Sequence, residues 1–420
     1  MKRAALASVV GFAALTALAP IRPTTPTNLH VLQFVGNNYY AATTGSSSNS
    51  GLSINSPWPL SLAISQAGPS NMITLLPGTY PSIDIARPEL SGLTLRSQIK
   101  WAAKIQGSPA MHGISTGVGV SNIVIDGLQV DHAFIDGIKI NGSGNTVRNC
   151  WIHHSGLGNP SAAPNGDASF SGQGVYLGCY NNNTIEYSLV ESNGVWNGND
   201  HGIYISGTNC VVRGNVLRYN WAYGLQLYTG YAGQSCCGLK VYDNLIYRNG
   251  ICNGGRNCLT VWAGPPGGNV GTTNYVFNNT LISDTWNPVV ANGGYLALSN
   301  NIILGSYDGS VAGVDGAVIW CDYNLLTNTL HAGNGVVNGG HNIITNGASF
   351  VNAGNGLFSL RSYSPARGVA NRNVIPPVDF FGKDQSAVAD VGAFQYSPLY
   401  ELDPRVLDPS PTNPDYWLGQ

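Results

Sequence analysis

The chain has 420 residues, of which 10% are charged, and its formal net charge at pH 7 is −2. A typical soluble domain has about 25% charged residues, so most of the polar surface here must come from Asn, Ser, Thr and Gly. The small net charge offers no basic field for nucleic acid, and the 54 glycines favour a turn-rich β protein.

The first twenty residues have the pattern of a secretory signal peptide. Lys2 and Arg3 precede an apolar run from Ala4 to Leu18, and Ala17-Leu18-Ala19 has the small residues of a cleavage site. The run is too short and too rich in alanine to span a membrane, and no later stretch approaches a span. We therefore predict a signal peptide at residues 1–20 and a secreted, soluble, monomeric protein without membrane insertion.

Residues 26–70 are predicted to form an N-terminal strand and a capping helix. Between Trp58 and Gly68 the apolar residues have helical spacing: Leu60, Leu62, Ala63, Ile64 and Ala67. A stack of coils needs such a cap, because its first coil would otherwise present an unpaired edge.

A repeated six-residue pattern is the main signal in the chain. It occurs at 125–130, 147–152, 185–190, 212–217, 241–246, 276–281 and 298–303. The shortest step between successive starts is 22 residues, which indicates the basic coil, and the longer steps indicate loop insertions. Each segment predicts a strand, a sharp polar bend and a second strand, with alternate apolar residues pointing inward.

One column of the repeat is polar at the bend. Asn215, Asn244, Asn279 and Asn301 occupy equivalent positions, and successive coils lie about 4.8 Å apart. Each side chain can therefore bond its equivalent in the next coil, and we interpret these asparagines as a structural ladder.

A third short strand completes each coil. It is predicted at 137–140, 174–177, 202–205, 224–227 and 258–261. Three strands per coil with no helical period between them predict an all-β parallel β-helix over residues 71–330, and the preference of parallel crossovers favours the right hand. Residues 331–420 are predicted to form terminal coils and a C-terminal cover.

The eight cysteines are interpreted in two ways. Cys252 and Cys258 bracket a short Gly/Asn segment and are the predicted disulfide of an exported chain. Cys150 and Cys210 fit either pairing or small apolar groups in a stacked core. The spacing of the cysteines does not match a metal site.

Three regions of the chain resemble the pectate-lyase-like superfamily of secreted bacterial right-handed parallel β-helix proteins. They are the segment from Tyr39-Tyr40-Ala41 to Leu76-Pro77-Gly78-Thr79-Tyr80, the coils at about 71–330, and Ser364-Pro365-Ala366 with Asp390-Val391-Gly392-Ala393-Phe394. The resemblance implies a polysaccharide lyase or uronan epimerase whose cleft follows the outer face of the third-strand column.

The predicted site follows from strand register. If Ile138 and Ile140 point inward, the residues of the outward column are Lys139, Tyr176, Tyr204 and Gln226, with Tyr228 and Trp262 two positions further along their strands. Asp136, Asp200 and His201 precede these strands, at the point where the loops enter.

The resemblance gives these residues roles in the removal of a proton next to a uronate carboxylate. Lys139 would neutralise the carboxylate or act as the base, His201 or Tyr204 would transfer a proton, and Asp200 would orient His201 or bind a cation. The substrate-binding residues would be Asp136, Tyr176, Gln226, Tyr228 and Trp262. Asp200-His201 is similar to the Asp-Pro-His-Asp motif of alginate epimerases but lacks the proline and the second aspartate.

Two other functions stay open. Asp136 and Asp200 lie two coils apart, about 9.6 Å, at the edge of the range for an inverting glycoside hydrolase. A non-catalytic glycan-binding or surface β-helix would need only the tyrosines. The structural alternatives are that Asp200-His201 merely caps a strand and that Lys139 is an ordinary surface lysine.

Other charged positions have structural interpretations. Arg148, Glu186 and Arg213 fit a salt-bridge ladder. His153 and His154, next to Asp131 and Glu191 of neighbouring coils, are interpreted as polar surface residues. Ca²⁺ is a possible cofactor, with Asp126, Asp131 and Asp167 as candidate ligands, although no Asp-x-Asp loop supports it.

Overall fold

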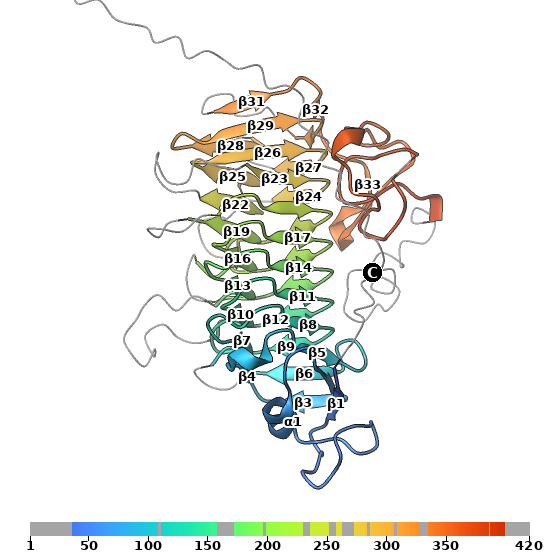
Figure 1. The fold of residues 1–420 in the computed structure, drawn as a ribbon. Helices are drawn as coiled ribbons and strands as arrows, with labels where there is room; N and C mark the ends of the chain where they lie inside the picture. The colour runs from blue at the N-terminus through green and yellow to red at the C-terminus, as the bar shows by residue number, and fades with distance from the viewer. Residues whose placement is uncertain are drawn as a thin grey trace, which may run out of the picture.

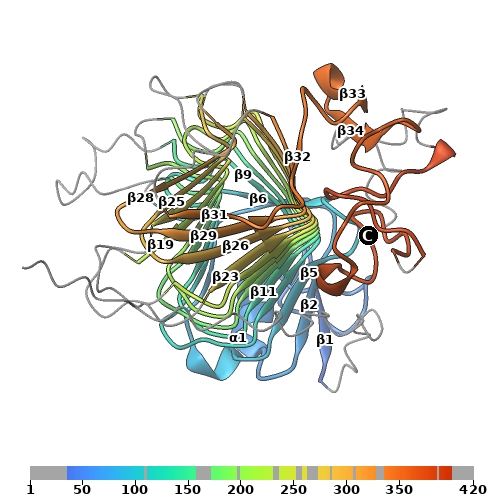
Figure 2. The same ribbon diagram turned by 90° about the horizontal axis from the view of Figure 1, so that it is seen from above.

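The computed structural model describes residues 36–107, 111–157, 172–195, 199–229, 236–251, 258–262, 273–283, 286–305, 309–327, 335–385 and 387–399. These residues form a stack of coils with three strands each (Figures 1 and 2), and the strands of successive coils pair in parallel into three long sheets. The predicted right-handed parallel β-helix with three strands per coil is confirmed.

We name the three sheets A, B and C in the order in which the chain visits them within a coil. Sheet A contains β1 (Asn38–Ala41), β2 (Met72–Leu75), β5 (Thr94–Ser97), β8 (Val124–Asp126), β11 (Thr146–Arg148), β14 (Thr184–Glu186), β17 (Val211–Arg213), β20 (Lys240–Tyr242), β23 (Asn274–Phe277), β26 (Tyr295–Ser299), β29 (Val318–Asp322) and β31 (Val336–Asn338). Sheet B contains β3 (Gly78–Tyr80), β6 (Ala103–Gln106), β9 (Gln129–Asp131), β12 (Trp151–His153), β15 (Leu189–Glu191), β18 (Val216–Arg218), β21 (Leu245–Tyr247), β24 (Thr280–Ser283), β27 (Ile302–Gly305), β30 (Leu325–Leu326) and β32 (Ile343–Ile344). Sheet C contains β4 (Ile83–Ile85), β7 (Ile114–Thr116), β10 (Ile138–Ile140), β13 (Val175–Leu177), β16 (Ile203–Ile205), β19 (Leu225–Tyr228), β22 (Leu259–Trp262), β25 (Val289–Asn292) and β28 (Val311–Val314).

The helical elements are few and short. α1 (Leu60–Gln66) lies at the N-terminal end of the stack (Figure 1), where it packs against β1 and β2 and buries Ala63. This confirms the capping helix predicted between Trp58 and Gly68. Three single turns of 3₁₀ helix are η1 (Pro88–Leu90), η3 (Ala353–Asn355) and η4 (Arg372–Val374). Within the described residues, no helix is both long and apolar enough to cross a membrane.

Alternation along each short strand builds the core. The inward residues of sheet C stack as Ile138, Val175, Ile203, Leu225 and Leu259, all of them fully buried. Cys150 and Cys210 are also buried in this core, as the apolar interpretation predicts. Cys252 lies outside the described residues, so its disulfide with Cys258 stays a prediction.

The predicted asparagine ladder is present at the corner between sheets A and B. The side-chain amide of Asn244 donates to Oδ1 of Asn279 at 2.9 Å, and Asn215 and Asn279 make the same bond to the next coil at 3.0 Å. The ladder runs on through Asn301 to Asn324 and Asn342. A second ladder of Asn193, Asn220 and Asn249, which we did not predict, follows sheet B.

Oppositely charged pairs hold the outer face of sheet A. Arg148 lies 2.9 Å from Asp126, and Arg213 lies 2.6 Å from Glu186, one coil apart in each case. The predicted pairing of Glu186 with Arg213 is confirmed, whereas Arg148 pairs with Asp126 of the preceding coil instead of with Glu186.

The C-terminal segment packs against the side of the stack instead of extending it (Figures 1 and 2). We call residues 348–396 the cover; it contains the antiparallel pair β33 (Phe350–Asn352) and β34 (Leu357–Leu360). Its Phe358, Phe380 and Phe394 pack with Leu189, Val216, Leu245 and Tyr247 on the outer face of sheet B. The cover thus buries an apolar strip that the coils alone would expose.

Candidate functional site

The outer face of sheet C brings four of the predicted site residues into one column. Lys139 pairs with Tyr176, Tyr176 with Tyr204, and Tyr204 with Gln226, in successive strands from β10 to β19. The predicted register is confirmed. We call this column, together with Tyr228, the sheet C wall.

The side chains of the wall form a stack with a cation at one end. The Lys139 ammonium lies 5.7 Å from the centre of the Tyr176 ring, and the rings of Tyr176 and Tyr204 are 5.2 Å apart and 5° from parallel. Tyr228 follows, 5.8 Å from Tyr204 and tilted by 42°. Lys139, Tyr176 and Tyr228 are half-buried, whereas Tyr204 and Gln226 are buried. A cation beside stacked rings suits the binding of an acidic sugar chain.

Trp262 stands next to Tyr228 in the backbone register of β19 and β22. Its side chain is not among the described ones, so its predicted stacking on sugar stays a prediction.

A polar ladder lies at the start of the sheet C strands. Each of its side chains accepts the backbone N–H of the equivalent residue one coil on. Asp136 N–H donates to His112, Gln173 N–H to Asp136, His201 N–H to Gln173, and Tyr223 N–H to His201, at 2.7 to 3.3 Å. Two predicted site residues, Asp136 and His201, therefore help to hold neighbouring coils together.

His201 lies on the same wall as Lys139 but inside it. Its ring stacks between Tyr223, at 4.8 Å, and Tyr204, at 6.2 Å, and only 1% of the residue is exposed. The sequence places His201 at the start of its strand, where the loops enter, and the structure shows that the residue is buried there. Because Nδ1 accepts the Tyr223 N–H at 3.2 Å, the neutral ring carries its proton on Nε2.

Asp200 is also buried, with 1% of the residue exposed. Its Oδ1 accepts the Gly172 N–H at 2.9 Å and its Oδ2 accepts the Val195 N–H at 3.1 Å. Asp136 Oδ1 likewise accepts the Gln173 N–H, and its Oδ2 lies 3.2 Å from Nδ1 of His112, the atom that accepts the Asp136 N–H. Both carboxylates thus fix the loop ends that enter sheet C, and neither presents a free oxygen pair for the activation of water.

The described residues of this region do not fit a Ca²⁺ site. Calcium needs six to eight oxygen ligands, and the carboxylates of Asp136 and Asp200 are already occupied. Of the sequence candidates, Asp126 pairs with Arg148 and Asp131 with Lys104 at 3.1 Å. Asp167 lies outside the described residues.

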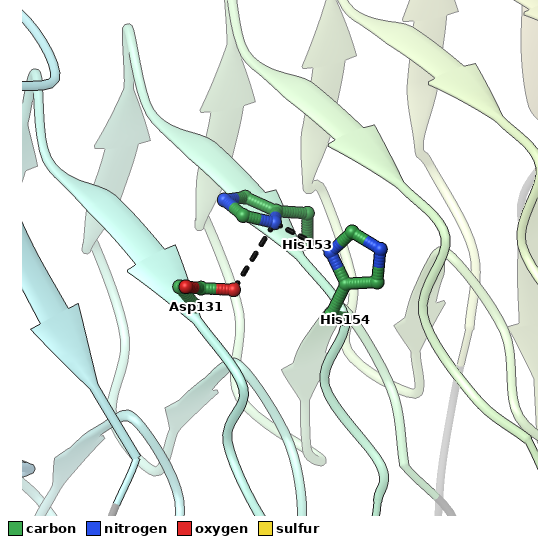
Figure 3. Close-up of side chains that lie close together, drawn as sticks. All are labelled: Asp131, His153 and His154. Atoms are coloured by element: carbon green, nitrogen blue, oxygen red, sulfur yellow. Dashed lines mark hydrogen bonds and ion pairs between the residues drawn. The ribbon is translucent and has the colours of Figure 1, made fainter.

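A cluster that we had assigned to the polar surface lies on another face, at β9 and β12 of sheet B (Figure 3). His153 pairs in register with Asp131, and its Nδ1 lies 3.2 Å from Asp131 Oδ1 and 2.7 Å from Nδ1 of His154. The surface interpretation is wrong for His153, because the residue is buried. The coil step of 22 residues was a usable signal, since it places Asp131-His132 directly beside His153-His154.

Burial governs the titration of this cluster. It lowers the pKa of His153 to about 4; Asp131 opposes that effect, while His154, His132 and Lys104 add to it. For Asp131, burial would raise the pKa, but the neighbouring His153, His132 and Lys104 outweigh burial and hold it below the usual value. At neutral pH the cluster therefore holds a carboxylate beside a neutral imidazole.

Comparisons with known proteins agree with this architecture. A sequence profile described as "Right handed beta helix region" matches residues 103–279. Pectate lyase L of Dickeya chrysanthemi is 31% identical over 134 residues, which cover 28% of this chain and 31% of that protein. The structure of pectate lyase Pel9A superposes with a TM-score of 0.57, at 15% identity, over 86% of this chain and 96% of that one. The chain thus has a right-handed parallel β-helix fold, which it shares with pectate lyase Pel9A.

Other solved β-helix structures are less similar in shape. The A-module of a mannuronan C-5 epimerase from Azotobacter vinelandii has a TM-score of 0.42 at 14% identity, over 68% of this chain and 92% of that one. The match to Pectate lyase L spans about a third of that relative's length. The comparisons therefore establish the scaffold, and the activity has to be argued from the site.

Proposed function

We propose that the chain is an exported lyase that acts on a uronate-containing polysaccharide bound along the sheet C wall. The observation that carries the proposal is the Lys139 ammonium at the end of the tyrosine stack formed by Tyr176, Tyr204 and Tyr228. The stack follows the axis of the β-helix, so a sugar chain that lies along it can meet several rings and the cation together. The signal-like segment at residues 1–20 supports export.

The chemistry of such a site is proton removal next to a carboxylate, followed by departure of the 4-linked sugar. A positive charge near the carboxylate stabilises the developing enolate, and Lys139 supplies that charge or takes the proton itself. The Nε2–H of His201 would donate a hydrogen bond to the leaving oxygen and stabilise the charge that develops there. Tyr204 lies beside it and is the other candidate donor.

The relatives support the same class of reaction. Pectate lyase L is named for the cleavage of an acidic polysaccharide, and pectate lyase Pel9A has the same fold. We infer an acidic polymer from this likeness together with the cation on the wall.

The test is a screen of the purified full chain against pectate, alginate and glycosaminoglycans, with and without Ca²⁺, that follows the absorbance of unsaturated uronate products. Lys139→Ala is expected to lower turnover strongly. Lys139→Arg separates the two roles, because guanidinium keeps its charge but does not give up its proton: retained turnover indicates carboxylate binding, and loss indicates the base. Lys240→Ala, a half-buried lysine of β20 on sheet A, is the matched control. If Lys139→Ala turns over substrate at the rate of the wild type, the proposal is contradicted.

A second candidate is a non-catalytic glycan-binding protein. The burial of Tyr204 and of the possible proton donor His201 favours it, because stacked rings bind sugar without reacting groups. Binding of an acidic polymer without any unsaturated product, and its loss in Tyr176→Ala, would select this candidate.

A further inference from the structure

We propose that Asp131, His153 and His154 form a binding site for one divalent transition-metal ion, of the chemical class of Zn²⁺, on the outer face of sheet B. This site lies on a different sheet from the wall formed by Lys139 and the tyrosines, and it does not depend on the proposed lyase activity.

The geometry of the side chains carries the proposal. One ligand atom from each residue, the Asp131 carboxylate oxygen and a nitrogen of each imidazole, lies within 4.8 Å of the other two. Figure 3 shows the two rings turned toward each other and toward the carboxylate. The distance from His153 Nδ1 is 3.2 Å to Asp131 Oδ1 and 2.7 Å to His154 Nδ1. Tetrahedral ligands of zinc stand about 3.3 Å apart when their bonds to the metal are about 2.0–2.1 Å long. The His153–Asp131 distance already fits this value, the His153–His154 distance has to widen, and Asp131 and His154 lie within 4.8 Å of each other.

The donor set selects the kind of ion. Two imidazole nitrogens and one carboxylate oxygen suit Zn²⁺, Cu²⁺ or Ni²⁺, whereas Ca²⁺ and Mg²⁺ prefer oxygen alone. His154 is exposed, so the site opens to solvent on that side and a water molecule can complete the coordination. Three protein ligands with one open position are common in zinc sites.

The neighbouring residues hold the ligands in place. Lys104 binds the other oxygen of Asp131, Oδ2, at 3.1 Å and leaves Oδ1 facing the imidazoles. His132, whose ring stacks on His154 at 5.2 Å, bonds to Asp131 Oδ1. The amide nitrogen of Gln129 lies 2.9 Å from Nε2 of His153, and a 180° turn of this amide exchanges its nitrogen and its oxygen. When its oxygen faces that nitrogen, Nε2 carries the proton and the lone pair of Nδ1 is available to the metal.

A bound ion would join two consecutive coils through their side chains. Asp131 ends β9, and His153 and His154 end β12 and begin the turn after it. The expected effect of the ion is therefore stabilisation of the N-terminal coils as well as binding, because an ion that binds only the folded state raises the melting temperature.

The experiment measures Zn²⁺ uptake by the full chain after treatment with a chelator and removal of the chelator. Isothermal titration with ZnCl₂ should give one ion per chain, and Co²⁺ should give the visible absorption of imidazole coordination. His154→Ala and Asp131→Asn should each weaken Zn²⁺ binding more than tenfold.

Two controls keep the result interpretable. His154 is exposed, so His154→Ala should retain the circular dichroism spectrum of the wild type. His341→Ala is the matched control, because His341 also lies beside a carboxylate, 3.1 Å from Asp322, but among the described residues it does not belong to a three-ligand group. Absence of saturable uptake by the wild type overturns the proposal, and so does equal affinity in His154→Ala, Asp131→Asn and the wild type.

Discussion

Asn244 shows how a single residue connects three consecutive coils. Its amide donates to Asn279 in the following coil and to the Val212 carbonyl in the preceding one, while its Oδ1 accepts from Asn215. The side chain is fully buried, so leucine would remove these three side-chain bonds from buried partners. We expect Asn244→Leu to lower the free energy of unfolding by about 1–3 kcal/mol, measured by chemical denaturation. Asn373→Leu, at an exposed asparagine of η4, should change little; equal losses in both variants would argue against the ladder as the cause.

His201 combines a structural contact with a proposed catalytic one, and two substitutions separate them. His201→Ala removes the acceptor of the Tyr223 N–H and should cost about 1–3 kcal/mol of stability. His201→Gln should restore most of that stability, because Gln173 performs the same task one coil earlier. If His201 transfers a proton, turnover should fall about 10²–10⁴-fold in both variants. If His201→Gln recovers both stability and turnover, the role of His201 is purely structural.

At the scale of elements, a buried carboxyl group of the cover, Asp379, lies near a buried carboxyl group of the coils, Asp243. Asp379 accepts the backbone N–H groups of Phe381, Lys383 and Gln395. Burial nevertheless raises the pKa of Asp379 to about 6, although these hydrogen bonds and the charge of Lys383 both lower it. Asp243, in the turn between β20 and β21, has its pKa raised well above the usual value by burial and by Asp379, with Arg213 opposing.

This arrangement predicts how the stability of the cover changes with pH. A carboxyl group with a raised pKa binds its proton more tightly in the folded state. Its contribution to the free energy of unfolding is therefore complete below about pH 4, the usual pKa of aspartate. This contribution is lost as the pH rises through about 6, the pKa of Asp379 in the folded state. Between these pH values we expect the free energy of unfolding of the wild type to fall by up to about 3 kcal/mol more than that of Asp379→Asn. Thermal melts of both proteins from pH 4 to pH 7 check this, and a constant difference between them would contradict it.

The elements also show what the sequence could predict. The inward alternation at Ile138, Val175 and Ile203 is a local property, so strands, register and the outward column with Lys139 followed from it. The ladder of Asn193, Asn220 and Asn249 repeats at a fixed position after sheet B and could have been found in the same way. The burial of His201 and Asp200 could not, because it depends on backbone amides from other coils and from entering loops.

At the scale of the whole molecule, the two proposed sites lie on different sheets of one rigid scaffold. The stacked tyrosines belong to sheet C, and the Asp131 cluster belongs to sheet B. Neighbouring coils in both sheets are tied by side-chain ladders, which resist sliding of one coil against the next. We therefore expect each site to keep its geometry when the other is altered.

The position of the cover has a consequence for the order of folding. Asn278 bonds to Gly392, 114 positions later, and Thr280 accepts from Ala393. The coils can assemble one upon another as the chain is synthesised, but the cover can dock only after its own residues exist. During that interval Leu189, Val216 and Leu245 remain uncovered on sheet B. The newly made protein is thus most prone to aggregation just before it is complete.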